Sequence, residues 1–290
     1  MIELKEAHKK FVEHLTQKDR SQATILAYGK DIEQLIEFLE NLSKTRTTHI
    51  NKNDLQAFMA KLEKENYTTK SISRKTNSTK TFFRFLELNE YITDNPANLI
   101  SHPKFDTPAP RILSKIEYRA LRDSCREDPR IAAIVEILLQ TGIRIGELRN
   151  LRVEDVIIDK TKNSGELIIQ PSHGHEGRNV PLNKSVIKSI SEYLKIRPNT
   201  KEETLFVTKT GKPLLIRNIR SAIDRYFSKA GVKNAKVNDL RHTFIAHHLM
   251  KGTSLILISK IVGHKRLSTT EKYLEHVRTA YKETFKLEEL

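Results

Sequence analysis

Several classes of protein can be set aside because the chain lacks what they depend on. Its 290 residues include a single cysteine, Cys125. One cysteine excludes an internal disulfide bond and a cysteine-rich metal site. No apolar run approaches the ~18 residues that a membrane-spanning helix needs, and the charged, amphipathic start MIELKEAHKKFVEHL is not that of a signal peptide. We therefore expect a cytoplasmic protein with no membrane partner.

Positive charge is what the chain has in excess, with a formal net charge of +15. Residues 1–100 carry 16 basic and 14 acidic side chains, whereas residues 101–290 carry 35 and 22. Basic side chains outnumber acidic ones by 9 to 3 in residues 41–80 and by 14 to 4 in residues 201–270. Two basic surfaces, one in each half, fit a polyanion gripped from two sides, and we expect nucleic acid. Solvated lysine faces are the alternative interpretation.

The first hundred residues have the pattern of a helical bundle. Two segments start with a residue typical of a helix N-cap: Ser21 in SQATILAYGKDIEQLIEFLEN and an asparagine in NKNDLQAFMAKLEKEN. Both then carry apolar residues at helical spacing. TTKSISRKTNSTKTFFRFLELNE joins an apolar end to a basic, hydroxyl-rich end that suits a phosphate backbone. The DNA contacts expected on this helix are Lys70, Arg74, Lys75 and Lys80.

A proline-rich stretch separates this bundle from the rest of the chain. DNPANLISHPKFDTPAPR holds four prolines, which end helices and stiffen an extended connection. Ser114 and Glu117 then form a capping-box pattern that restarts a helix. We expect a DNA-binding domain over residues 1–100, a linker over 101–111, a second domain over 112–279 and a C-terminal tail over 280–290.

The second domain is predicted to be mainly helical with one small sheet. DVIID, GELIIQ and RNVPL are short, β-branched and separated by turn residues, so they predict three antiparallel strands. Helices are expected at about 184–196, 216–230, 238–251, 254–262 and 268–277. The fold class is therefore mainly α, in two domains.

Three short motifs in the second domain combine cations with groups that can carry protons: LLQTGIRIGELRNL, VNDLRHTFIAHH and VGHKRLSTTEKY. Their notable side chains are Arg144 and Glu147 in the first, Arg241 and His242 in the second, and His264 and Tyr273 in the third. Glu147, one turn after Arg144, can brace its guanidinium group. Each motif alone has an ordinary explanation, namely a surface ion pair, a satisfied buried histidine or a core tyrosine.

Together and in this order, the motifs resemble the signature of the tyrosine site-specific recombinases, most closely the compact Xer-like members. The family's TGxRxxEL is here TGIRIGEL, its LRHT is present unchanged, and its GH precedes a tyrosine by nine residues, as His264 precedes Tyr273. RSQATILAYGKDIEQLIEFL and KTFFRFLELNEYITDNPANLI resemble the family's core-binding domain. The resemblance spans nearly the whole chain. It implies a SAM-like helical bundle followed by the tyrosine recombinase catalytic fold.

The resemblance also implies a DNA strand-transfer reaction through a covalent 3′-phosphotyrosine at Tyr273. Arg144, Arg241 and His264 would hydrogen-bond the non-bridging phosphate oxygens, with Glu147 bracing Arg144. The covalent intermediate conserves the energy of the broken bond for rejoining. No metal and no other cofactor is expected, in agreement with the lack of a ligand cluster or a phosphate-cradling glycine-rich loop in the sequence.

Two positions depart from the family pattern. Asn238 stands where the family has a histidine, and an asparagine cannot accept a proton from Tyr273. His173 stands where the family has a lysine that protonates the leaving 5′ oxygen, and a histidine can serve as an acid near neutral pH. His175 is the neighbouring candidate for the acid. A metal site formed by His173 and His175 is the less favoured alternative.

Cations beside these motifs are expected to contact backbone phosphate. They are Arg178, in the third predicted strand, and Lys265 and Arg266, directly after His264. Solvated loop charges are the alternative for the last two.

The resemblance implies a partner and an assembly. The partner is double-stranded DNA with a specific recombination site, held by the two domains as a clamp. Four copies would act on two paired sites and exchange their C-terminal tails, either in resolution of chromosome or plasmid dimers or in movement of a mobile element. A topoisomerase-like nicking enzyme and a DNA-binding protein that no longer cleaves are the alternatives.

Overall fold

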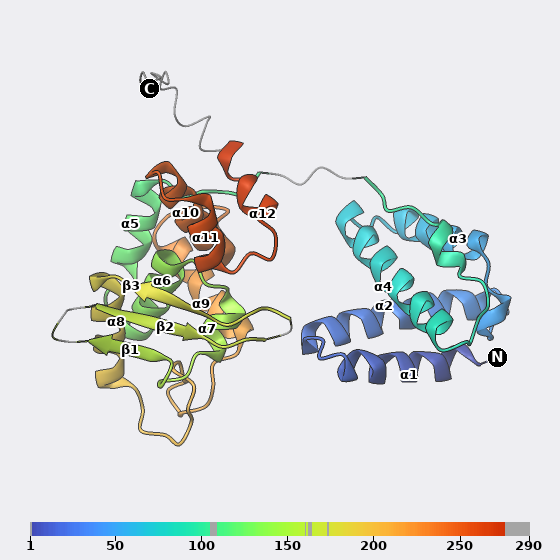
Figure 1. Cartoon of the computed structure of the whole chain (residues 1–290), viewed down its shortest axis with the longest axis horizontal. Helices are drawn as coiled ribbons and strands as arrows, with labels where there is room; N and C mark the ends of the chain where they lie inside the picture. The colour runs from blue at the N-terminus through green and yellow to red at the C-terminus, as the bar shows by residue number, and fades with distance from the viewer. Residues whose placement is uncertain (1, 105–108, 160, 162–163, 173, 276–290) are drawn as a thin grey trace. The chain divides into compact units, whose positions relative to one another are not determined.

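The computed structural model describes residues 2–104, 109–159, 161, 164–172 and 174–275, and Figure 1 labels its elements. The chain divides into two compact units, Met1–Thr107 and Pro108–Leu290. The division falls inside the segment 101–111 that the sequence analysis assigns to the linker. The expected C-terminal tail, residues 280–290, lies outside the described residues.

The first unit is a helical bundle, as predicted. Within residues 2–104 its α-helices are α1 (Leu4–Gln17), α2 (Gln22–Asn41), α3 (Lys52–Lys64) and α4 (Thr69–Leu88), with short 3-10 turns at Thr47–His49 and Pro96–Leu99. Ser21, Asn51 and Thr68 cap α2, α3 and α4 by accepting a backbone N–H hydrogen bond. The apolar faces then meet in one core, where the rings of Phe11 and Phe82 pack edge to face, 5.2 Å apart.

A buried ion cluster ties α2 to α4. Asp31 on α2 is 3% exposed. Its carboxylate accepts hydrogen bonds from Arg74, from Lys75 Nζ at 2.9 Å and from Ser78 Oγ at 3.0 Å. Two adjacent residues of α4 and a third about one turn later therefore neutralise and satisfy one carboxylate in the interior, as a buried charge requires.

The same cluster corrects one predicted DNA contact. Lys75 is 5% exposed, and its ammonium group also donates to Gln34 Oε1 at 2.6 Å, so it is enclosed between the helices rather than presented to solvent. Lys70 and Arg74 are exposed on the same helix and Lys80 is half-buried. These three stay predictions as DNA contacts.

The second unit is mainly helical with one small sheet, also as predicted. Its elements are α5 (Lys115–Ser124), α6 (Pro129–Thr141), α7 (Ile145–Asn150), β1 (Val156–Asp159), β2 (Ser164–Ile169), β3 (Arg178–Leu182), α8 (Lys184–Ile196), α9 (Ile216–Lys229), α10 (Val237–Met250), α11 (Leu255–Val262) and α12 (Ser268–Glu271). The strands are antiparallel in the order β1-β2-β3, with Leu167 of β2 opposite both Val156 and Val180.

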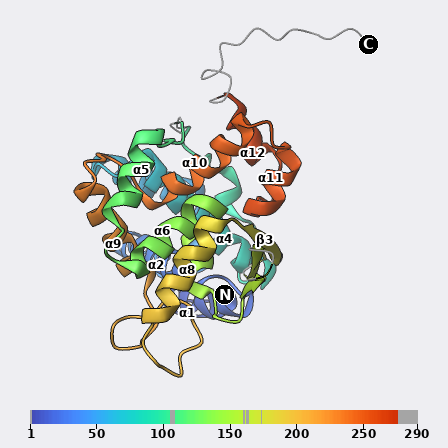
Figure 2. The ribbon, with the colours of Figure 1, turned by 90° about the vertical axis from the view of Figure 1, so that its left-hand side faces the viewer.

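Helix α6 is the central element of this unit. It packs against α8, α10 and strand β3, and Figure 2 shows it between α8 and α10. A helix surrounded in this way is apolar on nearly all sides. The sequence IAAIVEILL of α6 meets that demand, and most of the helix is buried. Because α6 ends at Thr141, Gly142 and the rest of the TGIRIGEL motif lie at a fixed place beside α10.

A turn interrupts the C-terminal helix that the sequence predicts over 268–277. Helix α12 ends at Glu271, Lys272 and Tyr273 form a turn, and Leu274 and Glu275 are helical again. The backbone N–H of Tyr273 bonds to Thr270 O, three residues back, so the chain tightens into a turn there. Residues 276 and 277 lie outside the described part of the chain.

Within the described part of the chain, no helix has the length and the apolar character needed to cross a membrane.

Asp31→Ala should destabilise the protein by about 3–5 kcal/mol, because it leaves the ammonium group of Lys75 buried without a counter-charge. Urea unfolding of the full chain, followed by circular dichroism, measures the loss. Glu33→Ala is the matched control, since Glu33 lies on the same helix in an exposed ion pair with Lys30. If both variants unfold like the wild type, the buried cluster does not stabilise the first unit.

Candidate active site

Arg144 is fixed at the start of α7 by the glutamate one turn later. The Arg144 N–H donates to Glu147 Oε2 at 2.7 Å, and its guanidinium Nη1 donates to Glu147 Oε1 at 2.9 Å. The chain reaches this point through Gly142, which ends α6 with a φ of +64°. A Cβ on Gly142 would lie 2.4 Å from Cδ1 of Phe244, so only glycine lets the turn approach α10 this closely.

Glu147 is shared between two arginines. Arg178 of β3 makes a bidentate pair with it, through Nη1 to Oε1 at 3.0 Å and Nη2 to Oε2 at 2.9 Å. Burial alone would raise the pKa of Glu147, but hydrogen bonds from Arg178 and from the Arg144 backbone outweigh it and lower the pKa. The carboxylate is therefore ionised and braces both guanidinium groups.

This pairing gives Arg178 a role inside the protein, and its expected contact with DNA stays a prediction. Its side chain is only 11% exposed, and Nε donates to the carbonyl oxygen of Ile261 at 2.6 Å. With every guanidinium nitrogen bonded inside the protein, Arg178 positions Glu147 and the end of α11.

Three arginines meet at the C-terminal end of α11. Beside the Arg178 bond to Ile261, Arg241 Nη2 donates to Val262 O at 2.8 Å, and Arg144 Nη2 donates to Gly263 O at 2.6 Å. The last carbonyl groups of a helix have no partner within it and form the negative end of its dipole. They therefore orient cations that come from α7, β3 and α10.

Arg144 and Arg241 lie close enough to share one acceptor. Arg144 Nη1 also lies 3.4 Å from Val262 O, the oxygen that Arg241 contacts, and Arg241 Nη1 donates to Gly142 O at 2.5 Å. Burial, and then the charge of Arg144, lower the pKa of Arg241 to about 10. Arg241 stays charged at neutral pH, in an interior that holds more cations than anions. Such a place favours a bound anion.

His264 follows directly on this helix end. Its backbone N–H bonds to Ser259 O at 3.0 Å, and its ring Nδ1 lies 2.7 Å from Thr270 Oγ1, which leaves Nε2 for another partner. Burial, followed by the charges of Arg241 and Arg144, lowers the pKa of His264 to about 4. The ring is therefore neutral at neutral pH in the free protein.

The turn between β2 and β3 and the turn after α11 line one open cavity of about 590 Å³, with His175, Arg178, His264 and Lys265 among its walls. Burial, and then Arg144 and Lys265, lower the pKa of His175. Lys265 and Arg266 are exposed, and their roles as phosphate contacts stay predictions. His173, the expected acid, lies outside the described residues.

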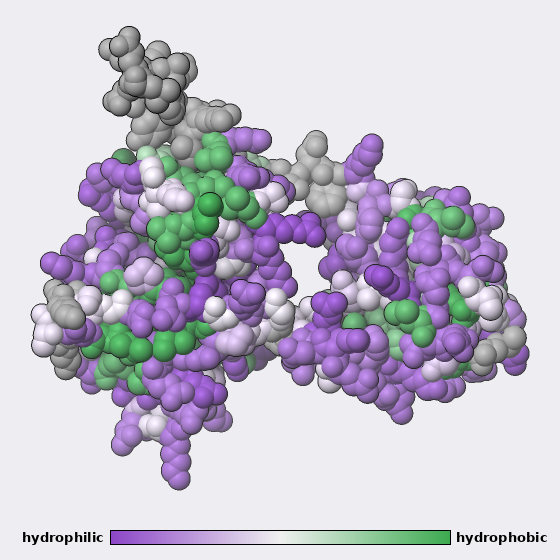
Figure 3. Space-filling model, viewed as in Figure 1, coloured by the Kyte–Doolittle hydropathy of each residue, from purple (hydrophilic) through white to green (hydrophobic). Residues whose placement is uncertain are grey.

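Tyr273 is buried at the edge of the site. It is 6% exposed and packs on an apolar cluster that includes Phe244 and Val262. Its hydroxyl lies 2.6 Å from Nδ1 of His242. Burial raises the pKa of Tyr273, so the hydroxyl is protonated at neutral pH. Figure 3 shows apolar surface over α10–α12. Ile256 and Leu257 of α11 are exposed apolar side chains.

Asn238 lies on the first turn of α10 and is exposed. It is three residues before Arg241 and four before His242, and these spacings place all three on neighbouring parts of one helix face. The structure thus brings Arg144, Glu147, Arg241, His264 and Tyr273 together in the second unit, with Asn238 one turn away along α10.

Sequence reasoning missed the roles of two residues. It treated His242 as a satisfied histidine and Arg178 as a DNA contact, whereas the structure places them against Tyr273 and Glu147. The four-residue spacing from Asn238 to His242 was a usable signal for the first. Nothing in the spacing along the chain pairs Arg178 with Glu147, because the contact depends on how β3 passes α7.

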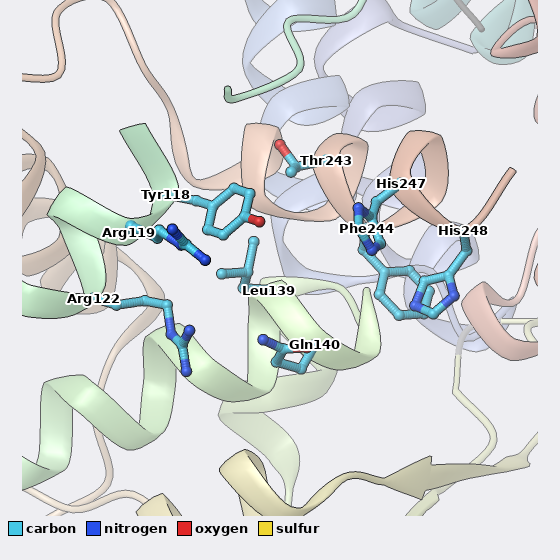
Figure 4. Close-up of a pocket in the computed structure, with 9 residues that line it drawn as sticks. All are labelled: Tyr118, Arg119, Arg122, Leu139, Gln140, Thr243, Phe244, His247 and His248. Carbon is cyan, nitrogen blue, oxygen red and sulfur yellow. The ribbon is translucent and has the colours of Figure 1, made fainter. Parts of the chain in front are cut away.

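A second cavity lies on another side of α10. It has a volume of about 160 Å³ and is lined by residues of α5, α6 and α10, including Arg122, Gln140 and His248 (Figure 4). None of the predicted site residues lines it.

Among the described residues, no three His, Cys, Asp or Glu side chains group closely enough to hold a metal ion.

Comparison with known proteins places these observations in one family. Residues 111–279 match the phage integrase family, and residues 9–90 match the phage integrase N-terminal SAM-like domain. The chain therefore belongs to the phage integrase family. It is a site-specific tyrosine recombinase, as the sequence motifs predict.

Its relatives include Xer recombinases. It is 28% identical over 288 residues to the tyrosine recombinase XerC of Oceanobacillus iheyensis, with 93% of each chain covered. It is 31% identical over 284 residues to the tyrosine recombinase XerD of Staphylococcus saprophyticus, with 92% of each covered.

Solved structures share its fold. A crystal structure of XerA recombinase aligns with 97% of this chain and 100% of its own, at 27% identity and a TM-score of 0.55. A lambda integrase tetramer bound to a Holliday junction aligns with 92% of this chain and 78% of its own, at 18% identity and a TM-score of 0.71.

His264 should stay neutral in the DNA-free protein until the pH falls to about 4. Arg241→Met removes the charge that lowers this pKa most after burial, so the pKa should move part of the way back towards about 6.5. NMR titration of the histidine ring protons measures it, with the His264 signal assigned by its loss in His264→Gln. Arg225→Met, an exposed change on α9, is the control and should leave the titration unaltered. An unchanged His264 pKa in Arg241→Met would contradict the expected effect of the Arg241 charge.

Proposed function

We propose that the protein cuts and rejoins duplex DNA at specific sites in the cytoplasm through a covalent 3′-phosphotyrosine at Tyr273. The observation that carries the proposal is the approach of the Arg144 and Arg241 guanidinium groups to one oxygen, Val262 O, beside His264. A phosphodiester group supplies the negative charge that this cation cluster lacks. Its two non-bridging oxygens also match paired guanidinium donors.

The reaction follows from these donors. The hydroxyl oxygen of Tyr273 bonds to phosphorus, and the bond from phosphorus to the 5′ oxygen breaks, leaving the 3′ end on the enzyme. Extra negative charge develops on the non-bridging oxygens in the transition state. Arg144, Arg241 and the Nε2 side of His264 hydrogen-bond these oxygens, and loss of one such donor typically slows a reaction by about 10²–10³. Attack of a 5′ hydroxyl on the phosphotyrosine rejoins a strand.

Each unit contributes cations to DNA binding in this proposal. Lys70, Arg74 and Lys80 of α4 serve the first unit, and Lys265 and Arg266 beside the site serve the second. These side chains are exposed or half-buried, which supports contact between their charges and backbone phosphates.

Four copies act together on two paired sites in this proposal, and the tails, residues 280–290, pass between neighbours. Support comes from the shared fold of the lambda integrase tetramer on a Holliday junction. The resemblance to XerC and XerD favours resolution of chromosome or plasmid dimers, or movement of a mobile element, as the cellular role.

Tyr273→Phe should abolish the covalent adduct and leave DNA affinity nearly unchanged, because only one hydroxyl is lost. The assay incubates the protein with a library of nicked duplexes that trap the covalent intermediate, and sequences the trapped ends. Tyr281→Phe is the matched control and should form the adduct normally. An adduct that persists in Tyr273→Phe would identify another nucleophile and overturn the proposal.

His173→Ala should slow cleavage of ordinary DNA strongly, if the imidazole protonates the leaving 5′ oxygen. A duplex with a 5′-bridging phosphorothiolate has a leaving group that needs no proton, so it should restore cleavage by this variant. His175→Ala is the matched control from the same turn and should cleave both substrates at wild-type rates. Normal cleavage of ordinary DNA by His173→Ala would assign the acid to another residue.

A further inference from the structure

The contact between His242 and Tyr273 has no part in the function proposed above. The two atoms, Nδ1 and the hydroxyl oxygen, are 2.6 Å apart, and the two ring centroids are 5.8 Å apart. Tyr273 is 6% exposed and His242 is half-buried, so water has little access to this hydroxyl. A hydrogen bond from a buried hydroxyl to an imidazole nitrogen has the geometry of a general base and its substrate proton.

The reaction needs a proton acceptor at this place. Burial raises the pKa of Tyr273, so the nucleophile starts as a neutral hydroxyl and must lose its proton as it attacks. Asn238 carries an amide, which can form hydrogen bonds but cannot take up a proton in this range. Without another acceptor, the oxygen would attack while still protonated.

His242 lies where a replacement for residue 238 has to lie. It is four residues further along α10, and residues four apart lie above one another on the same helix face. His242 directly follows Arg241, so α10 places Arg241 at the phosphate site and His242, one turn beyond Asn238, against Tyr273.

Burial keeps the ring of His242 neutral, because it is the largest effect on the pKa and lowers it. Asp239 on the same helix raises the pKa by less than burial lowers it, and the charge of Arg241 adds a smaller lowering effect. Tyr273, from the turn after α12, and His264, from the turn after α11, are the other titratable groups near it. A neutral ring with its proton on Nε2 presents an unprotonated Nδ1 to the hydroxyl.

We propose that His242 accepts the proton of Tyr273 during DNA cleavage and returns it during rejoining. This role rests on the proposed function of Tyr273. As the bond from the tyrosine oxygen to phosphorus forms, the proton passes to Nδ1 of His242. The bond from phosphorus to the 5′ oxygen breaks, and that oxygen takes a proton from the acid of the β2–β3 turn or from water. Rejoining reverses each transfer, so charge and protons balance over one cycle.

The test measures single-turnover formation of the adduct on a trapped nicked duplex, from about pH 5.5 to about pH 9. His242→Gln should cleave more slowly at pH 7 by about 10²–10⁴, the usual contribution of a general base. The wild-type rate should fall at acid pH as His242 becomes protonated. The His242→Gln rate should lack this fall and rise with pH as hydroxide removes the tyrosine proton.

Chemical rescue separates proton transfer from packing. Added imidazole should raise the cleavage rate of His242→Ala in proportion to its concentration, and it should not affect His242→Gln, in which the side chain fills the space. His248→Gln is the matched control, because His248 is a half-buried histidine on the same helix that packs against the ring of Phe244 and lines the cavity of Figure 4. Its rate and pH profile should equal those of the wild type.

The outcomes distinguish the two proposals. A wild-type protein that forms no adduct, or a Tyr273→Phe variant that still forms one, overturns the proposed function and this role with it. If the adduct depends on Tyr273 but His242→Gln forms it at the wild-type rate across the pH range, only the role of His242 is overturned. A slow His242→Gln variant with an unchanged pH profile, together with no imidazole rescue of His242→Ala, would assign His242 to packing and also overturn this role.

Discussion

The carbonyl groups at the end of one short helix, α11, orient the cations of the site. They accept hydrogen bonds from Arg144, Arg178 and Arg241, which arrive from α7, β3 and α10. Those residues are far apart in the chain, so the end of α11 is where distant segments of the second unit meet to form the site. Gly263 makes the arrangement possible, because its φ is +68° and a Cβ there would lie 2.8 Å from Nη1 of Arg178.

Charge balance explains why such an assembly suits a phosphodiester. Glu147 is the carboxylate that braces Arg144 and Arg178, and within the described part of the chain no carboxylate contact accompanies the two carbonyl bonds of Arg241. After burial, mutual repulsion among these cations is what lowers the pKa of Arg241 and of His264. An anion relieves that repulsion, and a transition state with more charge on its oxygens relieves it further. In the proposed reaction, donors that the helix carbonyl groups already hold in place need no reorganisation when the transition state forms. Relief of the repulsion among the cations then lowers the activation barrier of DNA cleavage.

The sequence was sufficient for the fold and for most of the side chains that the structure groups at the candidate site, because both leave local patterns. Helical periodicity, caps such as Ser21 and the motif around Arg144 each depend on residues within about two turns of one another. Contacts between distant segments leave no such pattern. Lys75 has the sequence of a surface cation, but it is buried against Asp31, forty-four residues earlier. Nothing near Arg178 in the sequence indicates that β3 brings it to Glu147.

The position of Tyr273 gives the departure at residue 238 a different meaning. Residues 238 and 242 lie one turn apart on the same face of α10 and differ in burial. Asn238 is exposed, whereas His242 is half-buried against Tyr273. An acceptor at the outer position would meet a tyrosine that has moved towards solvent, but an acceptor at the inner position meets the hydroxyl where it already packs. In the role proposed for His242, the proton leaves within the apolar cluster, where burial keeps the imidazole neutral and ready to accept it. An asparagine at the outer position is then compatible with cleavage, and it does not by itself indicate a protein that has kept only DNA binding.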